Sequence, residues 1–300
     1  MNKTQIHGFI FSLLSLSMVL SYATGIHWID SNSIYFLVAL IFFLGVPHGA
    51  LDPVFAKKLF HIRDLKSWFI FTISYSAVSL LVVSLWWIQP LLFMILFLIM
   101  SALHFSRDLG VSTSWITRVL YGGSIIVLPT LLNQSEVLNI FSAVTEPAVA
   151  GKLVNVLHLM ATSWLLFLAV AVIFELAQDW IVGLEIISVA LLALFTPPLV
   201  AFTIYFCLMH SLRHVIRTQT FANLNCRKLS IYALIPMLGT LALALLAWYF
   251  LPTDQDQDQD QARVLRFLFV GLASLTAPHM LLIDRVRYAE TRASLYGSTD

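Results

Sequence analysis

The fold of this chain is decided by stretches such as residues 90–106, which read PLLFMILFLIMSALHFS. A helix that crosses a bilayer needs roughly 20 predominantly apolar residues, and this run approaches that length with His104 as its one ionisable side chain. Working outward from it, similar runs bounded by polar or turn residues recur along the chain. The predicted spans are residues 7–25, 33–55, 67–88, 90–106, 117–133, 158–178, 181–196, 198–216, 231–251 and 263–284.

Composition supports the same fold class. The 300 residues are 59% hydrophobic and 11% charged, whereas a soluble domain carries about 25% charged residues. The sequence therefore predicts an all-α, polytopic transmembrane helix bundle of about ten spans, forming a single integral membrane domain over residues 1–300. The net charge of +1 excludes nucleic acid binding through a basic surface.

The basic residues predict the orientation of the spans, because Lys and Arg accumulate in cytoplasmic loops. With a cytoplasmic N-terminus, 14 of the 17 Lys and Arg residues fall on the inner side, and Lys152, Arg263 and Arg266 do not. We therefore expect both termini to be cytoplasmic and the protein to be a multi-pass protein of the cell's inner (plasma) membrane.

Two segments do not fit a bilayer span. Residues 134–157 mix apolar residues with Glu136, Glu146, Pro147 and Lys152, which predicts an amphipathic segment at the outer surface. Residues 252–262 contain the repeat DQDQDQDQ, which predicts a solvated, acidic, low-complexity loop on the outer side.

Five of the nine histidines lie near the end of a predicted span, in spans two, four, eight and ten. These spans all have even order, so they run from outside to inside and carry their histidines in the cytoplasmic half. Ionisable residues at membrane depth are costly and usually functional. We expect the five side chains to meet in one layer; they are His48, His104, His210, His214 and His279.

The spacing within this set points to a metal ion. His210 and His214 are four residues apart, so on a helix both project from one face and can chelate the same ion. With His48 and His104 they predict a four-imidazole metal site. Hydrogen bonding between helices is the alternative explanation of the same pattern.

Three carboxylates follow candidate ligands by about one helical turn. Asp52 follows His48 and Asp108 follows His104 by four residues, and Asp284 follows His279 by five. A carboxylate there can accept the second ring N–H of a ligating histidine and fix its tautomer. For Asp108 and Asp284, pairing with a nearby arginine is an equal alternative.

Four neutral imidazoles leave coordination positions open, which favours reaction at the metal over a structural role. Because the layer lies among apolar helices, the substrate expected there is lipid-soluble. Iron(II) that activates dioxygen against such a substrate is the predicted chemistry, and no catalytic residue is predicted beyond the metal ligands.

The histidine blocks also resemble a known family. The sequences PHGALD at 47–52, HF at 104–105, HSLRH at 210–214 and PH at 278–279 are similar, in order and spacing, to the signature blocks of the Brp/Blh family of bacterial and archaeal β-carotene 15,15′-dioxygenases. The resemblance covers about residues 33–288, and the acidic repeat at 254–261 lies outside the family pattern.

This resemblance implies an activity. It implies cleavage of the central double bond of β-carotene with dioxygen into two molecules of retinal, which serves microbial rhodopsins. It places the family's iron ligands on His48, His104, His210 and His214, and gives His279 a position near the metal or in the pocket.

Two other functions use intramembrane histidines. A haem or electron-transfer protein would use them as axial ligands on facing helices, and a proton-coupled transporter would use them as a relay. The pair at His210 and His214 points both imidazoles to one side, which disfavours haem. No internal repeat of the kind found in transporters is visible.

Overall fold

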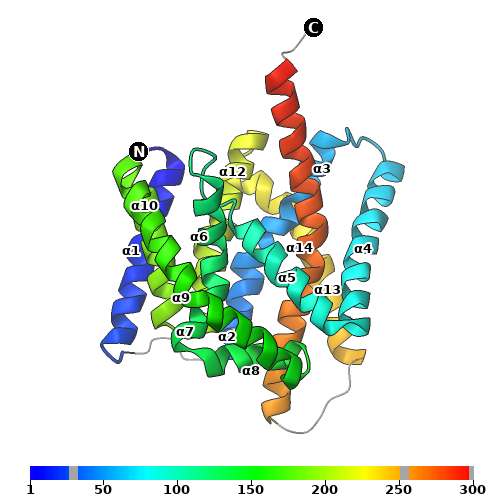
Figure 1. Ribbon diagram of the computed structural model, residues 1–300. Helices are drawn as coiled ribbons and strands as arrows, with labels where there is room; N and C mark the ends of the chain where they lie inside the picture. Colours follow the sequence, from blue (N-terminus) through cyan, green and yellow to red (C-terminus); the bar gives the residue numbers. More distant parts are fainter. Residues whose placement is uncertain (27–32, 251–256, 297–300) are drawn as a thin grey trace.

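Helices make up most of the described part of the chain, and many of them are long and apolar. The computed structural model describes residues 1–26, 33–250 and 257–296, and these contain helices and no strand (Figure 1). The all-helical class predicted from the apolar runs is therefore confirmed. The elements in chain order are α1 (Lys3–Ala23), α2 (Ile34–Leu40), η1 (Ile41–Gly45), η2 (Val46–Leu51), α3 (Asp52–Leu59), α4 (Leu65–Ile88), α5 (Pro90–Phe105), α6 (Trp115–Val127), α7 (Pro129–Leu132), α8 (Gln134–Val144), α9 (Pro147–Gln178), α10 (Trp180–Phe195), α11 (Pro198–Ile204), η3 (Tyr205–Ser211), α12 (Leu212–Ala222), α13 (Cys226–Phe250) and α14 (Gln257–Tyr296).

Eight helical segments within the described residues are long and apolar enough to cross a membrane. Two further apolar helices, α5 and α10, coincide with the remaining predicted spans, but each has 16 residues. At 1.5 Å per residue such a helix covers about 24 Å, less than the ~30 Å of a typical hydrocarbon core. Multi-pass character is supported, and the number of ten spans stays a prediction.

The ends of the chain lie at the same end of the bundle. Met1 and the C-terminal end of α14 are both at the top of Figure 1, where α14 extends beyond the other helices. An even number of crossings requires this arrangement. That this end is cytoplasmic remains a prediction from the Lys and Arg distribution.

The two segments predicted outside the bilayer have different outcomes. Residues 134–144 form α8, but residues 147–157 belong to α9, so the span predicted at 158–178 begins eleven residues earlier, at Pro147. Helix α8 lies at the end of the bundle away from the termini (Figure 1), and its position at an outer membrane surface stays a prediction. Of the acidic loop predicted at 252–262, residues 252–256 lie outside the described residues, and residues 257–262 are helical and form the first part of α14.

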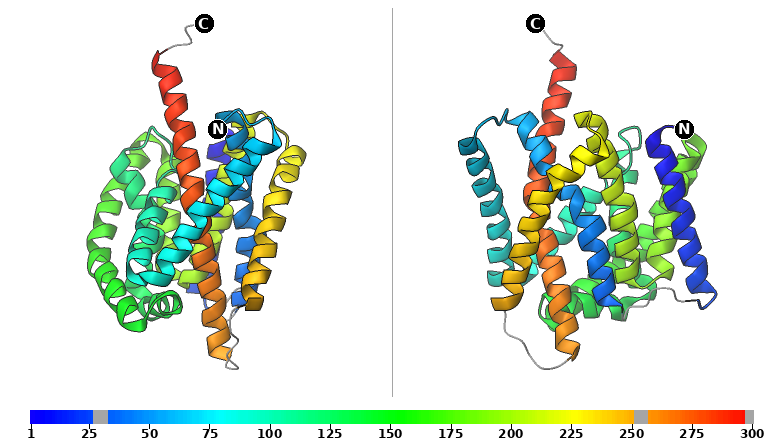
Figure 2. Two further views of the ribbon diagram at one scale, coloured as in Figure 1. Left: turned by 90° about the vertical axis from the view of Figure 1, so that its right-hand side faces the viewer. Right: turned by 180° about the vertical axis from the view of Figure 1, so that it is seen from behind.

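The helices divide into central and peripheral ones. Buried side chains concentrate on α6, α10, α11 and η3, whereas α4 has no buried residue. Figure 2 shows α1 beside α10 at one edge of the bundle and α4 at the other, with α13 nearby. Exposed apolar side chains on α4, α9 and α13 suit contact with lipid, because no hydrophobic penalty applies to them there.

Two predicted spans are not regular α-helices. In the span predicted at 33–55, α2 continues into the π-helical turn η1 and then the 3₁₀ segment η2, which contains Pro47 and His48. In the span predicted at 198–216, η3 is π-helical and contains His210. Such irregular turns rotate side chains away from the regular helical positions and recur at functional sites. Here the irregular part of each span carries a histidine, His48 in η2 and His210 in η3.

Helices α5 and α6 cross at Gly122. A Cβ atom at this position would lie 2.3 Å from the carbonyl oxygen of Ala102 and 2.4 Å from the amide nitrogen of Ser106. Both are backbone atoms of the chain that flanks His104, so they cannot move aside without displacing that histidine. Glycine therefore allows the close approach that fixes the end of α5 in the bundle.

Gly122→Ala is expected to destabilise the protein by about 1–3 kcal/mol, the usual range for inserting a methyl group into a well-packed interior. Thermal unfolding in detergent measures the loss. Gly151→Ala, on α9, is the matched control, because its Cβ would meet nothing within 4 Å. Equal unfolding temperatures for the two variants would contradict the tight crossing.

Candidate metal centre

The structure brings five histidines from different parts of the chain into one buried cluster. His48 comes from η2, His104 from the end of α5, His210 from η3, His214 from α12 and His279 from α14. His48 is central: its ring centroid lies 6.2 Å from that of His104, 4.8 Å from His210, 5.6 Å from His214 and 5.3 Å from His279. We call these five residues the histidine cluster.

The tightest group within the cluster includes a residue that the sequence placed among the secondary candidates. One ring nitrogen from each of His48, His104 and His279 lies within 4.8 Å of the other two. His210 and His214 stand close by, since the rings of His104 and His210 are 4.4 Å apart and those of His214 and His279 are 5.1 Å apart. His279 therefore belongs to the cluster as closely as the four predicted ligands do.

Hydrogen bonds to Nδ1 orient three of the five rings. His48 Nδ1 lies 2.6 Å from the carbonyl oxygen of Gly45, His279 Nδ1 lies 2.6 Å from Asp52 Oδ1, and His210 Nδ1 lies 3.0 Å from Asp108 Oδ1. Each acceptor requires the proton on Nδ1, which leaves the Nε2 lone pair of the same ring free to bind a metal.

Several ring nitrogens of the cluster are buried without a hydrogen-bond partner among the described residues. They are Nε2 of His210, His214 and His279 and both ring nitrogens of His104. Each such group costs about 1–3 kcal/mol if it stays unsatisfied, and four histidines in one cluster multiply this cost. A metal ion would bind one nitrogen from each of these four rings, so the donor set fits a transition metal that prefers imidazole, such as iron. Hydrogen bonding between helices, the alternative explanation, leaves these nitrogens unexplained.

The predicted carboxylates lie in other places than the spacing indicated. Asp52 pairs with His279 rather than His48, and Asp108 pairs with His210 rather than His104. The expectation assumed that helix continues through each pair. Instead, η2 is a 3₁₀ segment and Asp108 follows the end of α5 in a turn, so both carboxylates leave the faces that their histidines occupy.

Asp284 lies outside the cluster. Its carboxylate forms an ion pair with Arg107, and its side chain is 48% exposed. This is the arginine pairing that the sequence offered as the alternative for Asp284. Asp108 instead combines its histidine with contacts from two arginines, which reach its backbone oxygen: Arg213 Nη1 at 3.0 Å and Arg217 Nη2 at 2.7 Å.

A buried ion pair holds Arg213 in place. Its guanidinium makes a bidentate contact with Glu185 of α10, at 2.8 Å and 2.7 Å, and both side chains are 3% exposed. Ser211 Oγ also donates to the carbonyl oxygen of Leu44, at 2.6 Å. The polar residues between His210 and His214 therefore tie this block to η1, α10 and the turn at Asp108, which fixes the positions of the two histidines.

Two tyrosines complete the hydrogen bonding of the carboxylates. Tyr75 of α4 donates to Asp52 Oδ2 at 2.8 Å, and Tyr205 of η3 donates to Asp108 Oδ2 at 2.7 Å. Each aspartate thus joins one tyrosine to one histidine of the cluster. Neither tyrosine was predicted from the sequence. Each lies inside a predicted span, whereas most membrane-protein tyrosines lie at span ends near the membrane surface. A tyrosine hydroxyl at such depth needs a polar partner, and this was the signal that the sequence offered.

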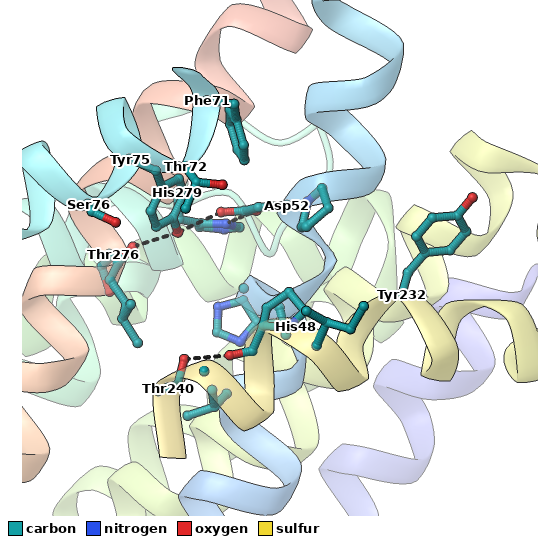
Figure 3. Close-up of a pocket in the computed structure, with 18 of the residues that line it drawn as sticks. His48, Asp52, Phe71, Thr72, Tyr75, Ser76, Tyr232, Thr240, Thr276 and His279 are labelled. Atoms are coloured by element: carbon teal, nitrogen blue, oxygen red, sulfur yellow. Dashed lines mark hydrogen bonds and ion pairs between the residues drawn. The ribbon is translucent and has the colours of Figure 1, made fainter. Parts of the chain in front are cut away.

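The histidine cluster borders a cavity of about 640 Å³, which His48 and His279 line together with Asp52 and Tyr75. Figure 3 shows Phe71, Thr72, Tyr75 and Ser76 of α4 on one side of this space. Helices α13 and α14 line other sides. The volume lies within the ~300–1,000 Å³ range of small-molecule sites. We call this space the main pocket.

Most of the residues that line the main pocket offer a ligand apolar surface rather than hydrogen-bonding groups. Thr240 Oγ1 donates to the carbonyl oxygen of Pro236 at 2.9 Å, and Thr276 Oγ1 donates to that of Leu272 at 2.7 Å. Their hydroxyls are therefore satisfied within their own helices. Most other lining residues are apolar or aromatic, such as Phe206 and Ile235. The geometry thus places candidate metal ligands at the wall of a hydrocarbon-compatible cavity.

Comparison with known proteins agrees with this geometry. A protein of an uncultured marine bacterium (66A03), named beta-carotene 15,15′-dioxygenase, is 28% identical over 260 residues, which are 82% of this chain and 91% of the relative. No solved structure matches the chain. Residues 39–286 match the family described as beta-carotene 15,15′-dioxygenase, a range that contains all five clustered histidines. The resemblance drawn from the histidine blocks is confirmed, and the chain belongs to the β-carotene 15,15′-dioxygenase family.

Proposed function

We propose that this protein cleaves β-carotene at its 15,15′ double bond with dioxygen, giving two molecules of retinal, at an iron(II) ion held by the histidine cluster. The observation that carries the proposal is the position of the cluster at the wall of the apolar main pocket. The name of the bacterial relative supports the same substrate.

The proposed iron ligands are His48, His104, His210 and His214, and the geometry adds His279 as a fifth candidate. Iron(II) bound there would supply the activation of dioxygen, which does not otherwise react readily with a hydrocarbon. The protein's own contribution is to hold the ring nitrogens. Gly45, Asp52 and Asp108 accept the Nδ1 protons and so keep three rings in the orientation and tautomer that a ligand needs.

The main pocket would hold the substrate by burial alone. β-Carotene has no polar atom, so a site for it needs apolar surface and few unsatisfied polar groups. The aromatic residues Trp68, Phe71 and Phe206 provide such surface, and the hydroxyls of Thr240 and Thr276 are already satisfied. Exclusion of water from this site would also protect a reactive intermediate from side reactions.

We propose that the substrate enters from the bilayer between α4 and α13, which both line the main pocket. These are peripheral helices with largely exposed apolar surfaces. A lipid-soluble carotenoid would therefore reach the metal without crossing water. The inner cell membrane is the proposed location, and a rhodopsin is the proposed recipient of the retinal.

Expression in a β-carotene-producing bacterium tests this function. Extracts separated by chromatography should contain retinal and less β-carotene than cells with an empty vector. Unchanged carotene in cells that hold the well-expressed, iron-loaded protein would refute the proposal. A haem absorption band in the purified protein would favour the electron-transfer alternative. Two aldehydes of unequal length would show that the protein is an oxygenase that cleaves β-carotene at a different double bond.

Tyr75→Phe is expected to weaken iron binding by roughly fivefold, because one hydrogen bond to the Asp52 carboxylate contributes about 1 kcal/mol net. Competition with a chelator measures the affinity. The ring remains to line the pocket, so the Michaelis constant for β-carotene should change little. Tyr232→Phe, which also removes a hydroxyl from the pocket wall, is the control and should bind iron as the unmodified protein does.

A further inference from the structure

A second, smaller cavity lies on another side of the bundle. Its volume is about 80 Å³, and its lining comes from α5, α6, α7, α8, α11 and α14. It shares no lining residue with the main pocket. Residues that represent its walls are Met94, Ile125, Val137, Phe141 and Phe269. We call it the small cavity.

The chemistry of the small cavity selects a small apolar molecule. Ser101 carries the one polar side chain in its lining, and the others are aliphatic, aromatic, methionine or proline. An ordered water needs about 2–4 polar partners, whereas apolar cavities stay dry and take up xenon or similar molecules. At 80 Å³, the space exceeds the ~10–15 Å³ that one water needs on the same measure, so it has room for a diatomic gas, and it is too small for a carotenoid.

One aromatic ring separates the small cavity from the histidine cluster. Phe105 lines the cavity, and its ring centroid lies 5.0 Å from that of His210 and 6.0 Å from that of His104. Phe105 is 4% exposed, so a gas molecule would pass only when this ring rotates within the core. The small cavity therefore has a short path to His104 and His210, two of the three clustered histidines that do not line the main pocket.

A pair of stacked aromatic rings separates the small cavity from the main pocket. Phe202 lines the small cavity and stacks at 5.3 Å on Phe206, which lines the main pocket. Phe206 in turn stacks at 5.7 Å on His210. A substrate that fills the main pocket would thus cover the side of the histidine cluster formed by His48 and His279. The other side, formed by His104 and His210, would stay accessible to a small molecule that passes Phe105.

We propose that the small cavity is a dioxygen-binding site that supplies the histidine cluster from the side of His104 and His210. This inference rests on the proposed oxygenase function. A hydrocarbon in the main pocket would block the approach of gas along the same route, so a separate apolar store lets the second substrate arrive after the first. Dioxygen is itself apolar, so an apolar cavity inside the bundle suits it.

Val137→Phe tests the site by filling it. Val137 is 4% exposed, lies on α8 and lines the small cavity but not the histidine cluster. We expect the Michaelis constant for dioxygen to rise several-fold, while iron content and the Michaelis constant for β-carotene stay unchanged. Val156→Phe makes the same substitution at a side chain of α9 that is 55% exposed, and it should leave all three quantities unchanged. An unaltered constant for dioxygen in folded Val137→Phe protein would overturn the proposal.

Xenon gives a second measurement that does not depend on turnover. In crystals pressurised with xenon, the unmodified protein should show a xenon atom in the small cavity, and Val137→Leu, a smaller change that is easier to accommodate, should show reduced occupancy. A carotenoid-cleaving protein without xenon there would refute the gas site alone. Xenon in the cavity of an iron-loaded protein that cleaves no carotenoid would refute the proposed function and retain the gas-binding cavity.

Discussion

His48→Ala is expected to abolish retinal formation and to lower bound iron to a small fraction of that in the unmodified protein. His48 is the residue whose ring lies within 6.2 Å of each of the other four histidines in the cluster. Its loss removes a proposed ligand and opens a gap between the cluster and the main pocket. Metal analysis of the purified protein and chromatography of its carotenoid products measure the two effects.

The control for this variant is His61→Asn. His61 lies after α3 with a φ of 50°, a conformation that asparagine tolerates well, and it is exposed and not part of the histidine cluster. It should retain both iron and activity. Normal carotenoid cleavage by His48→Ala would remove the argument for a histidine-held metal.

Asp108→Ala is expected to weaken iron binding by about 10–100-fold, the usual cost of removing a partner that orients a metal-bound histidine. The Asp108 carboxylate accepts hydrogen bonds from His210 Nδ1 at 3.0 Å and from Tyr205 at 2.7 Å. Its removal leaves two buried donors without an acceptor, so the unfolding temperature should also fall. Chelator competition and thermal unfolding measure these changes.

Asp284→Ala is the matched comparison for Asp108→Ala. For both aspartates the sequence offered support of a histidine and pairing with an arginine as equal alternatives. Asp284 pairs with Arg107, and its side chain is 48% exposed. Exposed ion pairs contribute about 0–1 kcal/mol, so iron affinity should stay close to that of the unmodified protein. A loss as large as that of Asp108→Ala would contradict the contacts described for Asp284.

The apolar runs predicted the helices well because bilayer-spanning segments must satisfy their backbone internally, and helices do so. The runs at 67–88 and 90–106 match α4 and α5 within two residues at each end. What hydropathy could not predict was the internal geometry of the segments around His48 and His210. A π-helical or 3₁₀ turn has the same composition as a regular helix and differs only in its hydrogen bonding.

The candidate site was partly predictable for a similar reason. Span order and the Lys and Arg distribution indicated that the histidines share one depth, and the structure brings their rings together. The partners of those histidines depend on contacts between helices. Asp52 meets His279, which is 227 residues away, and Tyr205 meets Asp108, which is 97 residues away. Spacing along one helix carries no information about such pairs.

The most direct test of the account is X-ray absorption at the iron K-edge of the purified protein, compared with that of His48→Ala. We expect iron surrounded by imidazole nitrogens in the unmodified protein, without sulfur or porphyrin scattering. The iron–imidazole signal should be lost in His48→Ala. A porphyrin pattern, or an iron environment that His48→Ala leaves unchanged, would contradict the claim that the histidine cluster is the metal centre.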